Sequence, residues 1–465
     1  MDFLDTSVVD LAAQVRTGEI TAMGLVDHAL ERIETLNPRI NAFVAIDAEA
    51  ARAGAQRIDD SVAAGADPGP LAGIPIGVKD LEHATGFVTT YGSPLHGNDA
   101  PSTVDSVLVG RLKGAGAIVV GKTNTPEFGH KGTTDNELFG STANPWNLEQ
   151  TPGGSSGGSG AALASGMVPL ATGSDGGGSI RIPSALCGLT GLKCQQGRIG
   201  GHIDGASAAM LLSVVGPMAR TASDTAWALD AVRGPHWADP FSLPVDERSW
   251  FEMTTNGDLP SRVVWSPTMG FAEVDPDIAA RCQAAVDRFE AAGTEVIVDD
   301  TVFEEKPLPG WATNWFLYLH KRLGHHHDTP EWGKISPMLQ TMIELGAEID
   351  SAEAADGLQQ MFARNHDVGS VLERHEADLL LTPSLALLPP TLAQIDAGDA
   401  ELGWVEFTFS LNMTRHPAGS VCVGRVGDLP VGLQVIGRHF DEPGVLAAMA
   451  AIEGLVDPIG RPAGI

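Results

Sequence analysis

The sequence predicts an α/β protein in which helices surround a β-sheet. Three observations lead to this fold class. The chain has 465 residues, 43% of them hydrophobic and 19% charged, which is enough to bury a large core. Strand-like and helix-like segments alternate along it, as in proteins whose strands are joined through helices. No internal repeat and no polar hinge divides the chain, so we expect a single domain over residues 1–465.

The first third of the chain shows this alternation most clearly. Apolar residues recur at helical spacing over 25–36, after a cap at Thr21, and predict a helix that ends at Asn37-Pro38. Residues 59–70 have loop composition. The next elements are expected to be a buried strand over 72–78 that ends at Lys79, a helix from Ser102, and a strand over 117–120.

A stretch rich in glycine and serine covers residues 153–178. It is too structured for a linker, because it contains a candidate helix of small residues at 160–165 and a candidate strand at 168–172. Beyond it, helix patterns near 275–292 and 351–375 alternate with strand-like runs at 262–265, 295–298, 379–381 and 430–436.

The net charge of −30 comes from 29 Lys and Arg against 59 Asp and Glu. This charge repels phosphate backbones and anionic membranes, so we expect no direct nucleic-acid partner and no membrane partner. The first 30 residues lack a signal peptide's basic start and apolar core. The four cysteines (Cys187, Cys194, Cys282 and Cys422) make neither a disulfide framework nor a zinc spacing. We expect a cytoplasmic monomer or homo-oligomer.

Two motif matches fail on their context. Residues 116–123 satisfy the P-loop pattern, but their variable positions are Ala-Ile-Val-Val, which favour a strand where phosphate binding needs a loop. The overlapping stretches 153–157 and 154–158 match the nucleophile elbow of α/β-hydrolases, yet residues 144–152 do not have the character of the strand that this motif requires. Neither nucleotide binding nor the α/β-hydrolase fold is favoured.

Histidines and aromatic residues cluster between residues 311 and 327. His320 and the histidines at 325–327 lack the i, i+4 spacing of a helical metal site, so we favour a solvated loop and expect no metal. Trp311 and Trp315 belong to an aromatic stripe at helical spacing. Core packing is the commoner explanation for such a stripe, and the wall of a substrate pocket is the alternative.

Lys79, the Ser155-Ser156 pair and Ser179 form the candidate catalytic group. A serine hydroxyl becomes a nucleophile when a base removes its proton, and a lysine can be that base when burial lowers its pKa. A shift from about 10.4 to near 7 needs roughly 4–5 kcal/mol of differential desolvation, which the apolar run before Lys79 can supply. The alternative is a strand-end lysine and a simple Gly/Ser turn, and spacing alone leaves both open.

The residues before Ser179 have the composition of an oxyanion hole. Asp175 is followed by Gly176, Gly177 and Gly178, whose backbone N–H groups no side chain blocks. We expect the N–H groups of residues 176–179 to bind a developing oxyanion, with Asp175 as a supporting residue. A helix that starts near Pro183 would add a favourable dipole.

Together these segments resemble the amidase signature family. The resemblance rests on Gly73–Asp80, Gly121–Gly129, Gly153–Ser159 and Asp175–Pro183, in that order, and it extends to residues 429–434. It also accounts for the P-loop match. It implies a twisted mixed β-sheet covered on both faces by α-helices. The signature core would occupy residues 70–200, and residues 201–465 would complete the same sheet and add helical insertions at the substrate pocket.

The resemblance implies a Ser-Ser-Lys triad that cleaves amide bonds without a metal or organic cofactor. Ser179 would be the nucleophile, Lys79 the base, and Ser155 the bridging serine, on a cis peptide after Gly154, while Ser156 would support the loop. The bridging serine relays a proton between two groups too far apart for one hydrogen bond. Water then hydrolyses the acyl-enzyme on Ser179.

Three positions depart from the family pattern without touching the triad. Cys194 and the following glutamine stand where Pro-Thr is usual, Arg415 stands where glycine is usual, and Cys422 replaces a proline. Arg415 could line a pocket and alter substrate choice, although a surface or structural role is the alternative. The candidate pocket residues are Phe128, Trp311, Trp315 and Arg415.

The substrate stays open among aryl amides, aliphatic amides, carbamates and esters, which share one acyl chemistry. The tryptophans near residue 315 point weakly to aromatic or apolar substrates. The alternative function is the glutaminase subunit of a tRNA-dependent amidotransferase complex, which predicts glutamine turnover and a partner. A catalytically silent scaffold is the other alternative, and the presence of all three triad residues argues against it.

Overall fold

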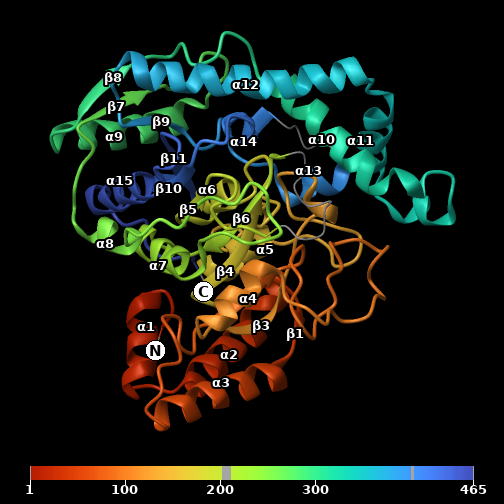
Figure 1. Cartoon of the computed structure of the whole chain (residues 1–465), viewed down its shortest axis with the longest axis vertical. Coiled ribbons are helices and arrows are strands. Elements are labelled where there is room, and N and C mark those ends of the chain that lie inside the picture. The colour runs from red at the N-terminus through yellow and green to blue at the C-terminus, as the bar shows by residue number, and fades with distance from the viewer. Residues whose placement is uncertain (1, 202–210, 399–402, 464) are drawn as a thin grey trace.

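The computed structural model describes residues 2–201, 211–398, 403–463 and 465 (Figure 1). Its strands are β1 (Phe43–Ile46), β2 (Pro75–Lys79), β3 (Ile118–Thr123), β4 (Leu170–Asp175), β5 (Gly191–Lys193), β6 (Val214–Met218), β7 (Arg262–Trp265), β8 (Glu295–Val298), β9 (Leu379–Pro383), β10 (Ala418–Val426) and β11 (Leu429–Gly437).

The described helices are α1 (Val8–Thr17), α2 (Ala22–Ile40), α3 (Ala48–Ala63), α4 (Val107–Gly114), α5 (Gly157–Ala164), α6 (Arg181–Cys187), α7 (Ala222–Val232), α8 (Trp250–Thr255), α9 (Pro276–Ala291), α10 (Leu308–Leu323), α11 (Pro337–Glu348), α12 (Ser351–Arg374), α13 (Leu392–Ala397), α14 (Ser410–Thr414) and α15 (Glu442–Leu455). Short 3₁₀ helices are η1 (Glu127–Gly129), η3 (Gly324–His326), η4 (Pro330–Lys334) and η5 (Gly403–Val405). Within the described residues, no helix combines the length and apolar character that a membrane crossing requires.

The strands form two sheets that meet at their edge strands. One has the order β1-β3-β2-β4-β6 and the other the order β5-β10-β11-β9-β7-β8. A bridge between Thr190 and Ala219 joins the β5 edge of one sheet to the β6 edge of the other. The pairs β2/β4 and β7/β9 are parallel, whereas β4/β6 and β10/β11 are antiparallel. The result is the mixed sheet with helices that the sequence predicted.

Helices cover both faces of this sheet. A Cβ atom at Gly432 of β11 would contact Ala185 of α6, and one at Gly419 of β10 would contact Met449 of α15. Gly419 pairs with Val435, which is an odd number of residues away from Gly432 along β11. Because successive strand residues point to opposite faces, α6 and α15 lie on opposite sides of the sheet.

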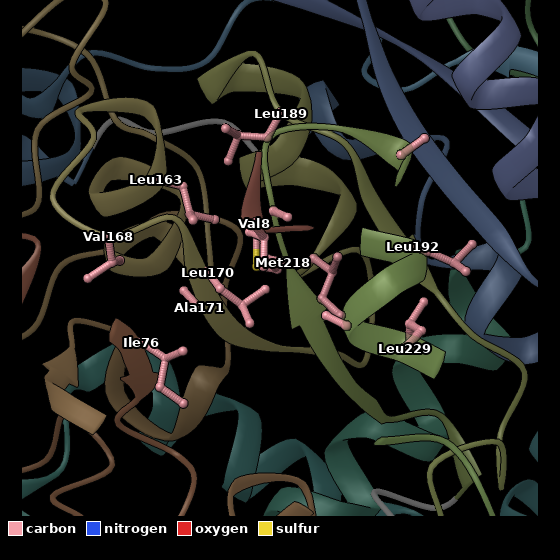
Figure 2. Packing of buried hydrophobic residues seen from close by; sticks show 14 of the residues in the cluster. Val8, Ile76, Leu163, Val168, Leu170, Ala171, Leu189, Leu192, Met218 and Leu229 are labelled. Atoms are coloured by element: carbon pink, nitrogen blue, oxygen red, sulfur yellow. The ribbon is translucent and has the colours of Figure 1, made fainter. Parts of the chain in front are cut away.

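The glycine-rich centre of the molecule lies between two helical regions. Helices α1 to α3 lie at one end of the view, beside β1 and β3, and the long helix α12 crosses the opposite end near α10 and α11 (Figure 1). Strands β4 and β6 and helices α5 and α6 lie between them. The core beneath this centre contains Ile76, Leu170, Met218 and Leu229, all fully buried (Figure 2). The central strands are therefore supported by a dry core, typical of strands covered on both faces.

Most of the predicted elements are present, but several boundaries differ. Strand β2 starts at Pro75 and not at residue 72, and β3 runs on to Thr123. Helix α2 starts after Thr21 as predicted but runs past Pro38 to Ile40. A proline in the last turn removes one backbone hydrogen bond but does not end the helix. Helix α3 occupies the start of the segment expected as a loop. Helix α4 starts at Val107, because the Ser106 hydroxyl accepts the Val109 N–H and caps it there.

Candidate active site

The site lies where the parallel strands β2 and β4 end. Ile76 pairs with Leu170 and Gly77 with Ala171, so both strands deliver the residues that follow to the same edge of the sheet. Lys79 is the last residue of β2. The carboxyl ends of parallel strands are where α/β proteins commonly bind their ligands.

Lys79 is fully buried among serine hydroxyls. Its Nζ atom lies 2.7 Å from Ser155 Oγ, 2.9 Å from Ser156 Oγ and 2.9 Å from Ser174 Oγ. Burial lowers the pKa of the ammonium group to about 7, and the negative charges of Asp175 and Glu82 oppose this shift only in part. The structure thus surrounds an amine that titrates near neutral pH with three hydroxyl groups.

The two serines of the glycine-rich stretch sit at the entry to α5. The peptide bond between Gly154 and Ser155 is cis. A Cβ atom at Gly154 would lie 2.3 Å from the Thr133 carbonyl oxygen, so only glycine allows this close approach of two backbones. The Ser156 N–H donates to the Ser179 carbonyl oxygen at 3.2 Å. This hydrogen bond joins the Ser155-Ser156 pair to the loop that carries Ser179.

Ser179 lies where two cavities meet. A cavity of about 70 Å³ is lined by Ser155 and Ser179 together, and Phe128 contributes to its wall. A second cavity of about 210 Å³ is lined by Ser179 and mainly by apolar residues, including Trp311. Trp315 lines both cavities. The aromatic stripe of α10 is thus partly core and partly cavity wall.

Arg415 is the candidate pocket residue that the structure places elsewhere. It lines neither of these cavities. It ends α14 in the left-handed conformation, with φ of 62°, and its guanidinium lies over the Phe241 ring at 5.9 Å. The left-handed turn and the Phe241 contact fit the structural role that the sequence left as the alternative, and a pocket role for Arg415 stays a prediction.

The glycine loop contributes fewer free N–H groups than expected. The Gly178 N–H donates to Asp175 Oδ1 at 2.7 Å, so it is already used within the loop. The N–H groups of Gly176, Gly177 and Ser179 have no acceptor among the described residues. Of the four N–H groups expected to bind an oxyanion, these three are therefore available for that role, because the Asp175 carboxylate already accepts the fourth.

Comparison with known proteins assigns the family. The family model described as Amidase matches residues 24–446. The chain belongs to the amidase family. This amidase is 36% identical to an acylamidase from Rhodococcus erythropolis, over 97% of this chain and 95% of the relative. It is 35% identical to a glutamyl-tRNA(Gln) amidotransferase subunit from Roseiflexus sp. (strain RS-1), over 96% of each chain.

Solved structures agree with this assignment. The crystal structure of a bacterial aryl acylamidase that belongs to the amidase signature family superimposes on the amidase with a TM-score of 0.89. The two chains are 27% identical, and the match covers 97% of this chain and 96% of the other. The amidase is therefore a hydrolase with the fold of the amidase signature enzymes.

A buried ionic network holds the loop before Ser179 in the amidase, and sequence reasoning assigned no role to most of its members. Arg181 Nε and Nη2 each donate to the Asp175 carboxylate at 2.9 Å. Arg181 also donates to Asn412 Oδ1 at 2.7 Å and to Gln434 Oε1 at 2.8 Å. Burial by itself would raise the pKa of Asp175, but the Arg181 guanidinium holds it well below its usual range. The sequence signal was a charged residue inside the apolar run 180–183.

Replacing Asp175 with asparagine should destabilise the amidase by about 3–5 kcal/mol, because it leaves the buried Arg181 cation without its partner. Urea denaturation measures this loss. The matched control is Asp27→Asn, which removes an exposed ion pair with Arg52 and should cost less than about 1 kcal/mol. Equal stabilities of the two variants would contradict the assigned role of the network.

Proposed function

We propose that this amidase cleaves amide bonds through an acyl-enzyme on Ser179, with Lys79 as the base and Ser155 as the proton relay. The observation that carries the proposal is the buried Lys79 amine, which lies 2.7 Å from the hydroxyl of Ser155 in front of a cavity that Ser179 also lines. A general base must lie within hydrogen-bond reach of the proton that it removes.

The three hydroxyl contacts of Lys79 suit a neutral amine. Such an amine has one lone pair and two N–H bonds, so it can accept a hydrogen bond from one hydroxyl and donate two to others. Ser155 gives the shortest of the three contacts. The Ser156 hydroxyl lies 3.3 Å from the Ser174 carbonyl oxygen and donates to it, which leaves its lone pairs for the amine. We therefore assign the accepting role of Lys79 to its contact with Ser155.

The reaction then proceeds by proton relay. Lys79 takes the proton of Ser155 as Ser155 takes that of Ser179, and Ser179 Oγ attacks the carbonyl carbon. The carbonyl oxygen becomes an oxyanion that free N–H groups of the glycine loop bind. When the C–N bond breaks, the relay returns the proton to the leaving nitrogen. Water, activated through the same relay, releases the acid from Ser179.

The two cavities that meet at Ser179 provide space for the two halves of an amide. The larger cavity has an apolar lining that includes Trp311 and Phe409, which favours an aryl or alkyl group there. The likeness to an acylamidase and an aryl acylamidase supports the same assignment. We propose an acyl amide with a bulky apolar substituent as the substrate class.

A glutaminase function within an amidotransferase complex is the second candidate. It is favoured by the 35% identity to a subunit of a glutamyl-tRNA(Gln) amidotransferase. The mainly apolar lining of the larger cavity weighs against it, because this lining suits an aryl or alkyl group better than the charged α-amino and α-carboxylate groups of glutamine. Glutamine hydrolysis by the chain only together with a second protein would support this candidate.

The proposal is tested by labelling the purified full chain with a fluorophosphonate probe and mapping the modified peptide. The expected label lies on Ser179. The same preparation is then assayed with 4-nitroacetanilide, 4-nitrophenyl acetate and glutamine. Release of 4-nitroaniline with no turnover of glutamine is expected. Absence of both labelling and turnover would refute the catalytic assignment.

A further inference from the structure

The backbone of the loop from Asp175 to Ser179 is held from outside at almost every peptide. Each carbonyl oxygen in this loop accepts a hydrogen bond. The donors are Asn412 Nδ2 at 2.9 Å for Asp175, Trp311 Nε1 at 2.9 Å for Gly176, Thr408 Oγ1 at 2.7 Å for Gly177, the Ile182 N–H at 2.7 Å for Gly178 and the Ser156 N–H at 3.2 Å for Ser179.

These carbonyl contacts determine where the N–H groups point. In a planar trans peptide the C=O of one residue and the N–H of the next point in opposite directions. A donor on the Gly176 carbonyl therefore directs the Gly177 N–H to the opposite side of the loop. In the same way, the hydrogen bond from Asn412 to the Asp175 carbonyl oxygen directs the N–H group of Gly176, which belongs to the same peptide. Thr408 directs the N–H of Gly178, which is the group already bound to Asp175.

We propose that Trp311, with Asn412, is a positioning residue that aims the oxyanion-binding N–H groups of Gly177 and Gly176, while Thr408 fixes the peptide that follows Gly177. The inference rests on the proposed function, because it assigns the aim of groups that the acyl-enzyme mechanism uses. Trp311 occupies the central place, since its indole N–H holds the peptide whose N–H belongs to Gly177, one of the three free groups.

A glycine loop needs such external donors. Glycine has no Cβ and visits a wide range of backbone conformations, so three consecutive glycines do not hold their peptide planes by themselves. Oxyanion stabilisation, however, depends on donors that are already aimed before the reaction. The side chains of Trp311, Thr408 and Asn412 hold the peptide planes that the glycines leave free to rotate.

The close packing of these side chains explains why the loop is glycine at these places. A Cβ atom at Gly177 would lie 2.8 Å from the Trp311 ring, and one at Gly178 would lie 2.3 Å from Thr408 Oγ1. The Trp311 ring in turn stacks on Trp315, with ring centroids 5.4 Å apart and planes at 17°. Close packing on the glycines and stacking on Trp315 thus hold the indole beside the peptide to which it donates.

Trp311 also lines the larger cavity, so replacing it can change substrate binding as well as the orientation of the loop. The variant Trp311→Phe keeps an aromatic ring in this wall and removes only the N–H donor. We expect kcat for 4-nitroacetanilide to fall by about 10-fold to 100-fold, somewhat less than the loss of a whole oxyanion donor, while KM stays within about threefold.

A transition-state analogue distinguishes a change in the orientation of the N–H groups from a change in how the substrate fits the cavity. A phenyl-substituted trifluoromethyl ketone forms a tetrahedral adduct with a serine and places an oxyanion on the same N–H groups. Its Ki should rise in Trp311→Phe by the same factor by which kcat/KM falls. A raised KM with unchanged kcat and unchanged Ki would make Trp311 a pocket wall only and would overturn the proposal.

Two threonines of the same segment provide a matched pair. Thr408→Val removes the donor to the Gly177 carbonyl and should raise Ki and lower kcat in the same direction as Trp311→Phe. Thr414→Val removes a buried hydroxyl that has no hydrogen-bond partner in the described chain, and kcat should stay within twofold. Equal kinetics in the two valine variants would overturn the proposal even where Trp311→Phe fails to fold. A wild-type chain that neither labels nor turns over substrate refutes the function itself instead.

Discussion

Replacing Ser179 with alanine should lower kcat by about 10⁴-fold or more, a loss of the size seen when a serine hydrolase loses its nucleophile. Ser179 is the serine that both cavities share, so its Oγ atom is placed to reach a carbonyl held between them. Without it no acyl-enzyme forms, and labelling by the fluorophosphonate probe should disappear. Steady-state kinetics and intact-mass measurement follow the two effects.

The control for this variant is Ser184→Ala. The Ser184 hydroxyl is buried in α6 and donates to the Ile180 carbonyl oxygen at 2.8 Å, and it lines neither cavity. Labelling and turnover should persist when it is removed. Labelling that survives in Ser179→Ala would place the nucleophile on another residue.

Replacing Lys79 with methionine should lower kcat by about 10³-fold or more, because the relay loses its base while the buried site keeps a side chain of similar length. In the wild type, burial lowers the pKa of Lys79 to about 7. The protonated amine cannot accept a proton, so kcat/KM should rise with pH through about 7 and level off above it. This rising limb should be absent from the residual activity of Lys79→Met.

A second buried lysine makes a control necessary. Burial and the nearby Arg181 charge lower the pKa of Lys193 to about 7 as well, and its Nζ atom donates to the His416 carbonyl oxygen at 2.7 Å. Lys193→Met should keep the rising limb of the pH profile. If the rising limb vanished in Lys193→Met and survived in Lys79→Met, the titrating base would be Lys193, and our assignment of the base to Lys79 would be wrong.

The lowered pKa also predicts a pH dependence of stability. Between pH 7 and about 10.4 the unfolded chain carries a proton on Lys79 that the folded chain has lost. The unfolded state therefore binds more protons, and the free energy of unfolding should rise with pH across this window. Urea denaturation at pH 7 and pH 9 should show a smaller rise in Lys79→Met than in the wild type.

Local sequence patterns were enough to find the elements that carry the site. The apolar run before Lys79 is strand β2, and the stretch of small residues after Ser156 is helix α5. Strands β7 and β8 lie at the strand-like runs predicted over 262–265 and 295–298. These patterns succeed because they report burial of one segment against a core, which a short window of sequence records.

The same patterns could not find the residues that donate hydrogen bonds to the backbone of the glycine loop. Asn412 donates to the backbone of Asp175 across a separation of 237 residues, and Thr408 reaches Gly177 across 231. Asparagine and threonine are common in helices and turns of any role, so neither stands out in its own segment. Arg415, in contrast, stood out because of its unusual place in the family pattern, but it lines neither of the cavities that meet at Ser179.

By itself the sequence determined which segments are buried, which stretch is free of side chains, and which lysine and serines belong to the signature of the family. Only the tertiary structure decided that the Gly178 N–H binds Asp175 while those of Gly176 and Gly177 have no acceptor among the described residues. The physical reason is that hydrogen bonds are directional and short. In our proposal, the orientation of the glycine peptides is therefore set by donors that distant segments of the chain bring within 3 Å of them.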